Sequence, residues 1–277
     1  MFKYLNWDYL RLKLQERNFV YQRIEDINIG DKVGIIASSH GDISALKKVV
    51  EYLIEKKEVK IIFHAGDIMD EHGGAIECLV EVLENKYIYP VLGNHDLLIL
   101  NKDYIHNYVD SYLELAKKTY NKIIETPELV SKILEIPVKI DTNYFSIVHE
   151  SVDPPYYAKL TKKKKKHHEL GQSVDENIYA VFSGALKHPY FIGSDHSAYI
   201  LDTKNYLRPK HIKPDTKITV SGSKVISIPS ISISKDKYYN CGGVVATINN
   251  DNSLTLEFFD LKDVKTKVRE EYLIESM

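Results

Sequence analysis

Five short motifs carry the residues that could do chemistry. They are Ser38-x-His40-Gly41, Gly66-Asp67-x-x-Asp70, Gly93-Asn94-His95-Asp96, His149 and Gly193-Ser194-x-His196. Their nitrogen and oxygen donors suit Mn, Fe or Zn, and none of them is a thiolate. Taken singly, each motif has an ordinary explanation as a hydrogen-bonded histidine or a turn. Because each motif follows an apolar run, the set as a whole favours a metal centre.

The elements that must position these motifs alternate between strand and helix. We expect strands over 32–37, 59–64 and 87–92, with helices over 44–56 and 74–84 between them. This alternation predicts α/β packing with parallel strands, and ligands in such sheets gather beyond the carboxyl ends of the strands. The first three motifs stand at those ends.

In the remainder of the chain, the pattern is helical before Pro137 and strand-like after it. Residues 102–135 are expected to form a helical insertion interrupted at Pro127, and 5–17 an amphipathic helix. The later part is expected to be strand-rich, with strands over 138–141, 144–148, 190–192, 198–201, 218–220, 225–228, 243–248 and 254–259. Asn249 to Asn252 would form the last hairpin turn, and 153–188 a polar excursion. With no evident linker, the 277 residues are predicted to form a single domain.

Composition excludes several classes of protein. The 37 basic and 39 acidic residues give a net charge of −2, which provides no general attraction to nucleic acid or membrane. No segment reaches the roughly 20 apolar residues of a membrane span, and the N-terminus lacks the apolar core of a signal peptide. Cys78 and Cys241 form neither a metal pair nor a disulfide framework, so we expect a cytoplasmic protein.

The ordered motifs resemble the signature of the calcineurin-like metallophosphoesterases, which reads D-x-H, G-D-x-x-D, G-N-H-D or G-N-H-E, a lone H, then G-H-x-H. The resemblance covers roughly residues 33–201 and implies a two-sheet α/β/β/α sandwich holding two divalent metal ions, Mn, Fe or Zn. It implies a phosphoesterase that hydrolyses a phosphomonoester or phosphodiester through metal-bound water. The substrate would be a phosphorylated small molecule, a nucleotide or a nucleic acid.

The resemblance also implies a role for each matching residue. Asp67 would bridge the two metals, with His40 and His196 on the first and Asn94 and His149 on the second. Asn94 and His95 would meet the substrate phosphate, and His95 would protonate the leaving oxygen while the Asp70 carboxylate orients its imidazole. General chemistry supports this arrangement, because paired cations clamp phosphoryl oxygens and a histidine donates protons near neutral pH.

Two positions depart from the family pattern. Ser38 stands where the aspartate of D-x-H belongs, and Ser194 stands where the first histidine of G-H-x-H belongs. Each metal would lose one protein ligand, and Asp67 would be the only ligating carboxylate. We therefore expect a weakened centre that holds two metals, one or none. Asp42 and Asp195 are alternative ligands, although Asp42 also suits a helix cap, and His64 would pack behind the site.

Three functional hypotheses follow. The first is the metal-dependent phosphoesterase. The second is a catalytically degenerate binding or regulatory protein, which the two serines favour. The third is nucleic-acid binding through the run Lys162 to Lys166, which would lie near the rim of the site, although such runs are usually solvated. Replacing Ser38 by Asp and Ser194 by His separates the first two, and the salt dependence of binding tests the third.

Overall fold

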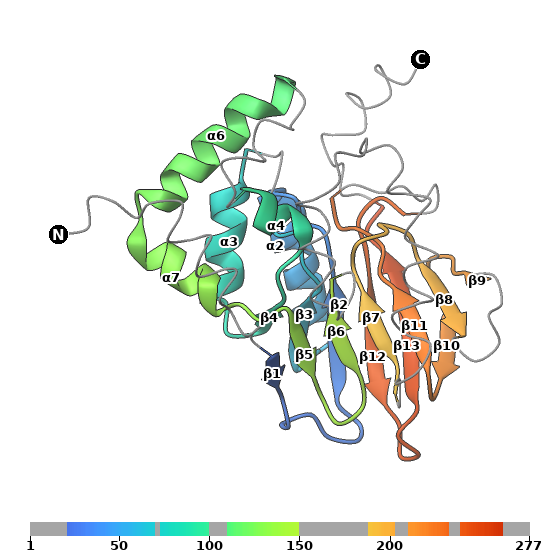
Figure 1. The fold of residues 1–277 in the computed structure, drawn as a ribbon. Helices are drawn as coiled ribbons and strands as arrows, with labels where there is room; N and C mark the ends of the chain where they lie inside the picture. Colours follow the sequence, from blue (N-terminus) through green and yellow to red (C-terminus); the bar gives the residue numbers. More distant parts are fainter. Residues whose placement is uncertain are drawn as a thin grey trace.

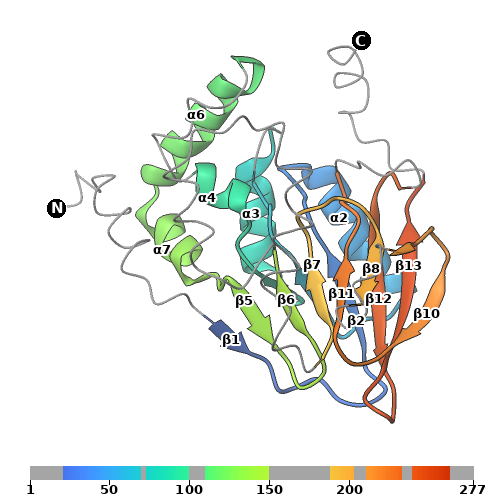
Figure 2. The ribbon, with the colours of Figure 1, turned by 45° about the vertical axis from the view of Figure 1, so that its right-hand side comes forward.

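A computed structural model describes residues 21–69, 73–99, 110–149, 188–202, 210–232 and 239–262. Its strands form two mixed sheets, whose strands overlap in the views of Figures 1 and 2 because the sheets are stacked. Within the described residues, one sheet has six strands in the order β10-β13-β12-β2-β3-β4, and the other has seven in the order β1-β5-β6-β7-β11-β8-β9.

The six-stranded sheet contains the elements of the predicted strand and helix alternation. Its strands are β2 (Lys32–Ile36), β3 (Ile61–His64), β4 (Ile88–Pro90), β10 (Lys217–Val220), β12 (Gly242–Ile248) and β13 (Leu254–Asp260). The strands β2, β3 and β4 are parallel neighbours, whereas β12 runs antiparallel to β2. The seven-stranded sheet consists of β1 (Tyr21–Arg23), β5 (Lys139–Asp141), β6 (Ser146–Val148), β7 (Tyr190–Ile192), β8 (Tyr199–Asp202), β9 (Lys210–His211) and β11 (Lys224–Ser227).

The helices are α2 (Ile43–Glu51), α3 (Ala75–Glu84), α4 (Asn94–Ile99), α6 (Asp110–Ile124) and α7 (Pro127–Glu135). A short π-helical segment, η1 (Tyr52–Lys56), extends α2. The apolar faces of α2, α3, α6 and α7 share one hydrophobic cluster with the outer side of the six-stranded sheet. Figure 1 shows where these helices lie in the fold. Within the described residues, no helix covers the outer face of the seven-stranded sheet.

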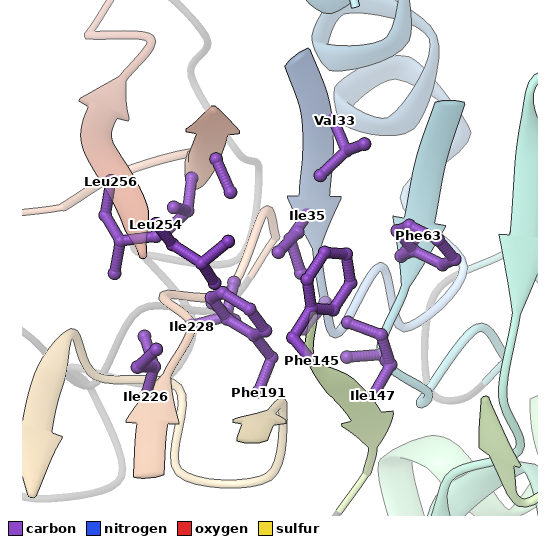
Figure 3. Packing of buried hydrophobic residues seen from close by; sticks show 14 of the residues in the cluster. Val33, Ile35, Phe63, Phe145, Ile147, Phe191, Ile226, Ile228, Leu254 and Leu256 are labelled. Atoms are coloured by element: carbon purple, nitrogen blue, oxygen red, sulfur yellow. The ribbon is translucent and has the colours of Figure 1, made fainter. Parts of the chain in front are cut away.

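A second hydrophobic cluster fills the space between the two sheets (Figure 3). Along β2 the side chains alternate, so that Val33 and Ile35 enter this cluster and Ile36 faces the helices. The Phe145 ring lies between Phe63 and Phe191, with ring centroids 5.6 and 5.4 Å apart and near-perpendicular planes. These aromatic contacts join β3 of one sheet to β7 of the other, and so fix the sheets relative to each other.

The predicted fold class is confirmed as a mixed α/β architecture with two sheets, and every strand expected from the sequence overlaps an observed one. Three details differ: β1 and β9 were not expected, Asn94 opens a helix rather than lying in a loop, and the helix after Ser44 changes to π geometry at Tyr52. The predicted helix over 5–17 and all but the last residue of the polar excursion over 153–188 lie outside the described residues. The division into a single domain stays a prediction.

Candidate metal centre

The five motifs lie just beyond the carboxyl ends of parallel strands from both sheets. His40 follows β2, Asp67 follows β3, Asn94 and His95 open α4 after β4, His149 directly follows β6, and His196 follows β7. Since β2, β3 and β4 are parallel, as are β6 and β7, their motifs emerge at one end of each sheet. The sequence-based expectation that these loops would meet is therefore realised by the topology.

Hydrogen bonds tie the loops of the two sheets together. The Ser38 amide donates to the Gly66 carbonyl at 2.9 Å, and the Gly193 amide donates to the His149 carbonyl at 2.8 Å. The Ser38 hydroxyl then crosses between the sheets and donates to the carbonyl of Gly193 at 3.0 Å. These bonds fix the spacing between the motifs of the two sheets.

Two glycines allow the loops to approach closely. A Cβ atom on Gly93 would lie 2.1 Å from Oδ1 of Asp67, and one on Gly66 would lie 2.6 Å from Nδ1 of His149. Gly66 also has a φ of 82°, which side chains rarely adopt. Any larger residue at either position would displace a predicted ligand.

Four site residues have left-handed backbone conformations. Their φ values are 58° for Ser38, 44° for His40, 58° for Asp67 and 55° for His196. Such conformations are unfavourable for residues other than glycine and cluster at functional sites. Here each of them lies in a loop that carries a predicted ligand or stands at a ligand position of the family pattern.

Asp67, His40 and His196 lie close together, and we call these three residues the first group. The Nε2 atoms of His40 and His196 are 3.1 Å apart, and Nε2 of His40 is 3.9 Å from Oδ2 of Asp67. One ligand atom from each of the three residues lies within 4.8 Å of the others, and their exposed fractions are 1, 1 and 7% for His40, Asp67 and His196. Two imidazoles and one carboxylate facing a common point suit a divalent transition metal.

Asp67, Asn94 and His149 form the second group, in which His149 approaches the same Oδ2 atom of Asp67 as His40 does. Nε2 of His149 lies 3.1 Å from Oδ2 of Asp67 and 2.9 Å from Oδ1 of Asn94. The Nδ1 atom of His149 is 2.7 Å from the Ala65 carbonyl, which can only accept, so Nδ1 carries the proton. In the neutral ring, the Nε2 lone pair then faces a carboxylate oxygen, an arrangement that requires a proton or a cation between them.

The electrostatics of Asp67 follow from these neighbours. Burial by itself would raise the pKa of its carboxyl group, but the charges of His149, His95 and His40 and the hydrogen bond from His149 outweigh burial. The pKa is therefore held well below its ordinary value. Asp67 is thus a buried carboxylate in its charged form, as a metal-bridging ligand must be.

His95 lies next to both groups. Its amide donates to Oδ1 of Asp67 at 3.0 Å, and its ring meets that of His40 edge to face with centroids 5.0 Å apart. His95 is therefore placed beside the predicted metal ligands. Asp70, the carboxylate predicted to orient its ring, lies outside the described residues.

Comparison with known proteins identifies the family. The sequence profile of calcineurin-like phosphoesterases matches residues 32–212, which is more than half of the chain. The chain belongs to the calcineurin-like phosphoesterase family. Members of this family generally bind divalent metals, and the donors of the first group fit such an ion. Comparison with curated protein sequences gives no match.

Solved structures show the same fold. A metallophosphoesterase from Sphaerobacter thermophilus aligns with a TM-score of 0.60 and 18% identity, covering 90% of this chain and 96% of the other. A hypothetical protein from Pyrococcus horikoshii aligns with a TM-score of 0.56 and 14% identity, covering 88% of this chain and 93% of the other. At these identities the likeness establishes the fold of this calcineurin-like phosphoesterase.

The two serines that depart from the family pattern behave differently. The Ser38 hydroxyl donates to the Gly193 carbonyl, and the Ser38 carbonyl accepts from the hydroxyls of Ser230 and Ser232 at 2.9 and 2.8 Å. The Ser194 Oγ atom is buried and has no hydrogen-bond partner within the described part of the chain. The Ser38 hydroxyl therefore links the two sheets, whereas the Ser194 hydroxyl could still donate or accept a hydrogen bond.

The two alternative ligands predicted from the sequence, Asp42 and Asp195, accept hydrogen bonds from other groups. Asp42 caps α2, since its Oδ1 accepts from the Ala45 amide at 2.9 Å. Asp195 accepts a hydrogen bond from the Tyr199 hydroxyl. His64 is fully buried behind the site, where its Nε2 lies 3.1 Å from the Ser39 hydroxyl, and burial lowers its pKa to about 3.

Sequence reasoning assigned no role to Asp96, the last residue of the Gly93-Asn94-His95-Asp96 motif. Its buried carboxylate accepts backbone N–H groups from both the Asp67 loop and Gly93. Burial and the charge of Asp67 raise the pKa of Asp96, while its backbone N–H donors favour the ionised form and act against this shift. The sequence contained a signal for this role. An acidic residue at the third position of a helix typically accepts a hydrogen bond from the backbone amide of the residue just before the helix, here Gly93.

Two further expectations concern other parts of the chain. The lysine run from Lys162 to Lys166 lies outside the described residues. In the described part of the chain, no helix is both long and apolar enough to cross a membrane.

Proposed function

We propose that this chain is a metal-dependent phosphoesterase that hydrolyses a phosphomonoester or a phosphodiester. The observation that carries the proposal is the buried Asp67 carboxylate, whose Oδ2 lies 3.9 Å from Nε2 of His40 in the first group and 3.1 Å from Nε2 of His149 in the second group. A charged carboxylate oxygen that two imidazole nitrogens approach suits a ligand shared by two divalent cations.

The donor set indicates which ions the centre would take. Imidazole, amide and carboxylate donors without a thiolate suit Mn, Fe or Zn, with His40, Asp67 and His196 on one ion and Asp67, Asn94 and His149 on the other. Bound cations would polarise the phosphoryl oxygens and lower the pKa of a coordinated water. Asp67 is the only carboxylate in the two groups, so we expect the ions to be held more weakly than at a centre with two carboxylates.

His95 and Asn94 are the residues proposed to meet the substrate phosphate. The Asn94 amide belongs to the second group, and the His95 backbone is fixed to Asp67 by its 3.0 Å hydrogen bond. This leaves the imidazole of His95 beside the predicted ions, where it would give a proton to the leaving oxygen. The substrate is proposed to be a phosphorylated small molecule, a nucleotide or a nucleic acid.

A cytoplasmic location is proposed with this activity. Cys78 and Cys241 are both buried and free of disulfide bonds. Their burial raises the pKa of each thiol far above its ordinary value, which makes them unreactive packing residues. Free, buried thiols are typical of proteins from reducing compartments.

The experiment combines metal binding with hydrolysis. Purified protein would be reconstituted with Mn, Fe or Zn and assayed with aryl phosphate mono- and diesters. The proposal predicts hydrolysis that requires metal and is lost in both His40→Ala and His149→Ala. His211→Ala is the matched control, because His211 is an exposed histidine on β9. Absence of both metal binding and hydrolysis in the wild-type protein would overturn the proposal.

The second candidate is a catalytically degenerate protein that uses the same fold for binding or regulation. Ser38 and Ser194 favour it, because two ligand positions of the family pattern hold neutral hydroxyls. The double variant Ser38→Asp with Ser194→His separates the candidates. A large gain in both metal affinity and hydrolysis would identify the serines as lesions, whereas unchanged or lower activity would mean that the site uses them.

A further inference from the structure

The carboxylate of Asp96 is surrounded by backbone donors. It is fully buried in the first turn of α4 and accepts four N–H groups. Its Oδ1 accepts from Ile68 and Met69, each at 2.8 Å, and its Oδ2 accepts from Gly93 at 2.8 Å and from Asp67 at 3.1 Å. With both oxygens occupied by two donors each, the carboxylate has no lone pair left for a metal.

These donors belong to two loops that are far apart in the sequence. Three of them are consecutive residues, from Asp67 to Met69, in the loop after β3, and the fourth precedes α4. Consecutive amides that converge on one anion form a backbone nest, in which one residue takes a left-handed conformation. Asp67 has that conformation, with a φ of 58°. The Asp96 carboxylate is the anion that this nest surrounds.

The nest determines where the Asp67 side chain lies. Oδ1 of Asp67 accepts the His95 amide at 3.0 Å, one residue before Asp96. Gly93 has to lack a side chain, because its Cβ would lie 2.1 Å from the same Oδ1. Asp96 therefore binds the loop that carries Asp67, and the neighbouring His95 amide in α4 binds the Asp67 carboxylate itself.

We propose that Asp96 is a positioning residue, which places the Asp67 carboxylate within reach of both His40 and His149 before any metal binds. This inference rests on the proposed function for the claim that Asp67 is a metal ligand. Asparagine is the informative replacement, because it keeps the size of the side chain but presents an NH2 group to two N–H donors. Those donors then lose their acceptor, and the left-handed conformation of Asp67 loses its support.

The test compares Asp96→Asn with Asp260→Asn. Asp260 offers a matched control, since its Oδ1 accepts the amides of Asn240 and Cys241 at 2.7 and 2.8 Å in segments that carry no predicted ligand. Mn²⁺ affinity would be measured by calorimetric titration, and the visible spectrum of the Co²⁺-loaded protein would report ligand geometry. Asp96→Asn is expected to lose roughly 10- to 100-fold in affinity and to change the Co²⁺ spectrum. Asp260→Asn should keep its affinity to within about twofold, as expected for a carboxylate outside the ligand shells.

A folded Asp96→Asn protein with wild-type affinity and spectrum would overturn the inference. Should that variant fail to fold, hydrogen exchange of the metal-free wild-type protein decides instead. The amides of Ile68 and Met69 are expected to be strongly protected without metal, and rapid exchange there would contradict positioning by Asp96. A wild-type protein that binds metal and hydrolyses phosphate esters while Asp96→Asn does the same would remove this inference alone. A wild-type protein that binds no metal would remove the proposed function instead.

Discussion

The first and second groups share Asp67 but are supported in different ways. In the second group, the His149 ring is oriented by the Ala65 carbonyl at 2.7 Å, and the His149 carbonyl accepts the amides of Gly193 and Ser194. In the first group, the imidazoles of His40 and His196 face each other at 3.1 Å, and both residues have left-handed backbones. Hydrogen bonds to backbone groups thus orient His149 in the second group. In the first group, the Nε2 atoms of two imidazoles lie next to each other.

The replaced positions differ in the same way. Ser38, at the missing position of the first group, has become a link between the two sheets through its bond to Gly193. Ser194, at the missing position of the second group, has a buried hydroxyl with no partner among the described residues. The Ser38 hydroxyl thus contributes a hydrogen bond between the two sheets, whereas the Ser194 hydroxyl contributes none within the described residues. Restoring a ligand should therefore succeed more readily at position 194 than at position 38.

The largest effect is expected from a change that affects both groups. Asp67→Asn removes the only carboxylate the groups share and leaves paired imidazoles without a counter-charge. Loss of a residue that only supports a metal ligand can cost up to about 100-fold in affinity. Loss of the shared ligand itself should lower metal affinity by at least that factor. Calorimetric titration with Mn²⁺ would measure it. Asp31→Asn, at the opposite end of β2 from the site, is the control, and equal affinities for the two variants would contradict the bridging role.

Ser194→His sharpens the comparison by adding a ligand to the second group. The Ser194 hydroxyl makes no hydrogen bond in the described part of the chain, so its replacement breaks none there. An added imidazole should raise the affinity for Zn²⁺ by roughly tenfold, equivalent to about 1.4 kcal/mol. Competition with a chelating dye would measure the gain. The same gain in a protein that also carries His149→Ala would show that the new histidine acts elsewhere.

Ser38→Asp should behave in the opposite manner. The hydroxyl that donates to the Gly193 carbonyl becomes a carboxylate that cannot donate, in a fully buried position. The metal-free protein should lose about 1–3 kcal/mol of unfolding free energy, measured by urea denaturation. Ser38→Ala, which removes the bond without adding a charge, should cost about 1 kcal/mol. A metal-free Ser38→Asp protein as stable as the wild type would show that the fold does not depend on this link.

The smallest effect at neutral pH is expected from the histidine behind the first group, because it acts only as the pH falls below 6.5. Burial lowers the pKa of His64 to about 3 from an ordinary 6.5, so the unfolded chain takes up a proton that the folded chain does not. Its contribution to stability is present above pH 6.5 and is lost as the pH falls toward 3, by up to about 1.4 kcal/mol per pH unit. His64→Leu should therefore flatten the acid side of the stability profile, and an unchanged slope would contradict this assignment.

Much of the fold and part of the site could be predicted from the sequence. The strands were recognisable because apolar runs end in polar motifs, and the motifs had to meet because the carboxyl ends of parallel strands share one edge. Strand β9 was missed, since it has two residues, both exposed, and therefore no apolar pattern. The link through Ser38 and the nest around Asp96 join residues 155 and 28 positions apart. Ser38 donates to a backbone carbonyl and Asp96 accepts from backbone amides, so one partner in each contact is a group that every residue possesses.

Counting bound metal ions tests the central claim most directly. The wild-type protein, His40→Ala and His149→Ala would each be loaded with Mn²⁺ or Zn²⁺, freed of loosely held ions and examined by elemental analysis. We expect about two ions per wild-type chain, and about one in each variant because each loses one group. A wild-type protein without bound metal, or variants that keep the full number, would show that the two groups do not hold a pair of metal ions.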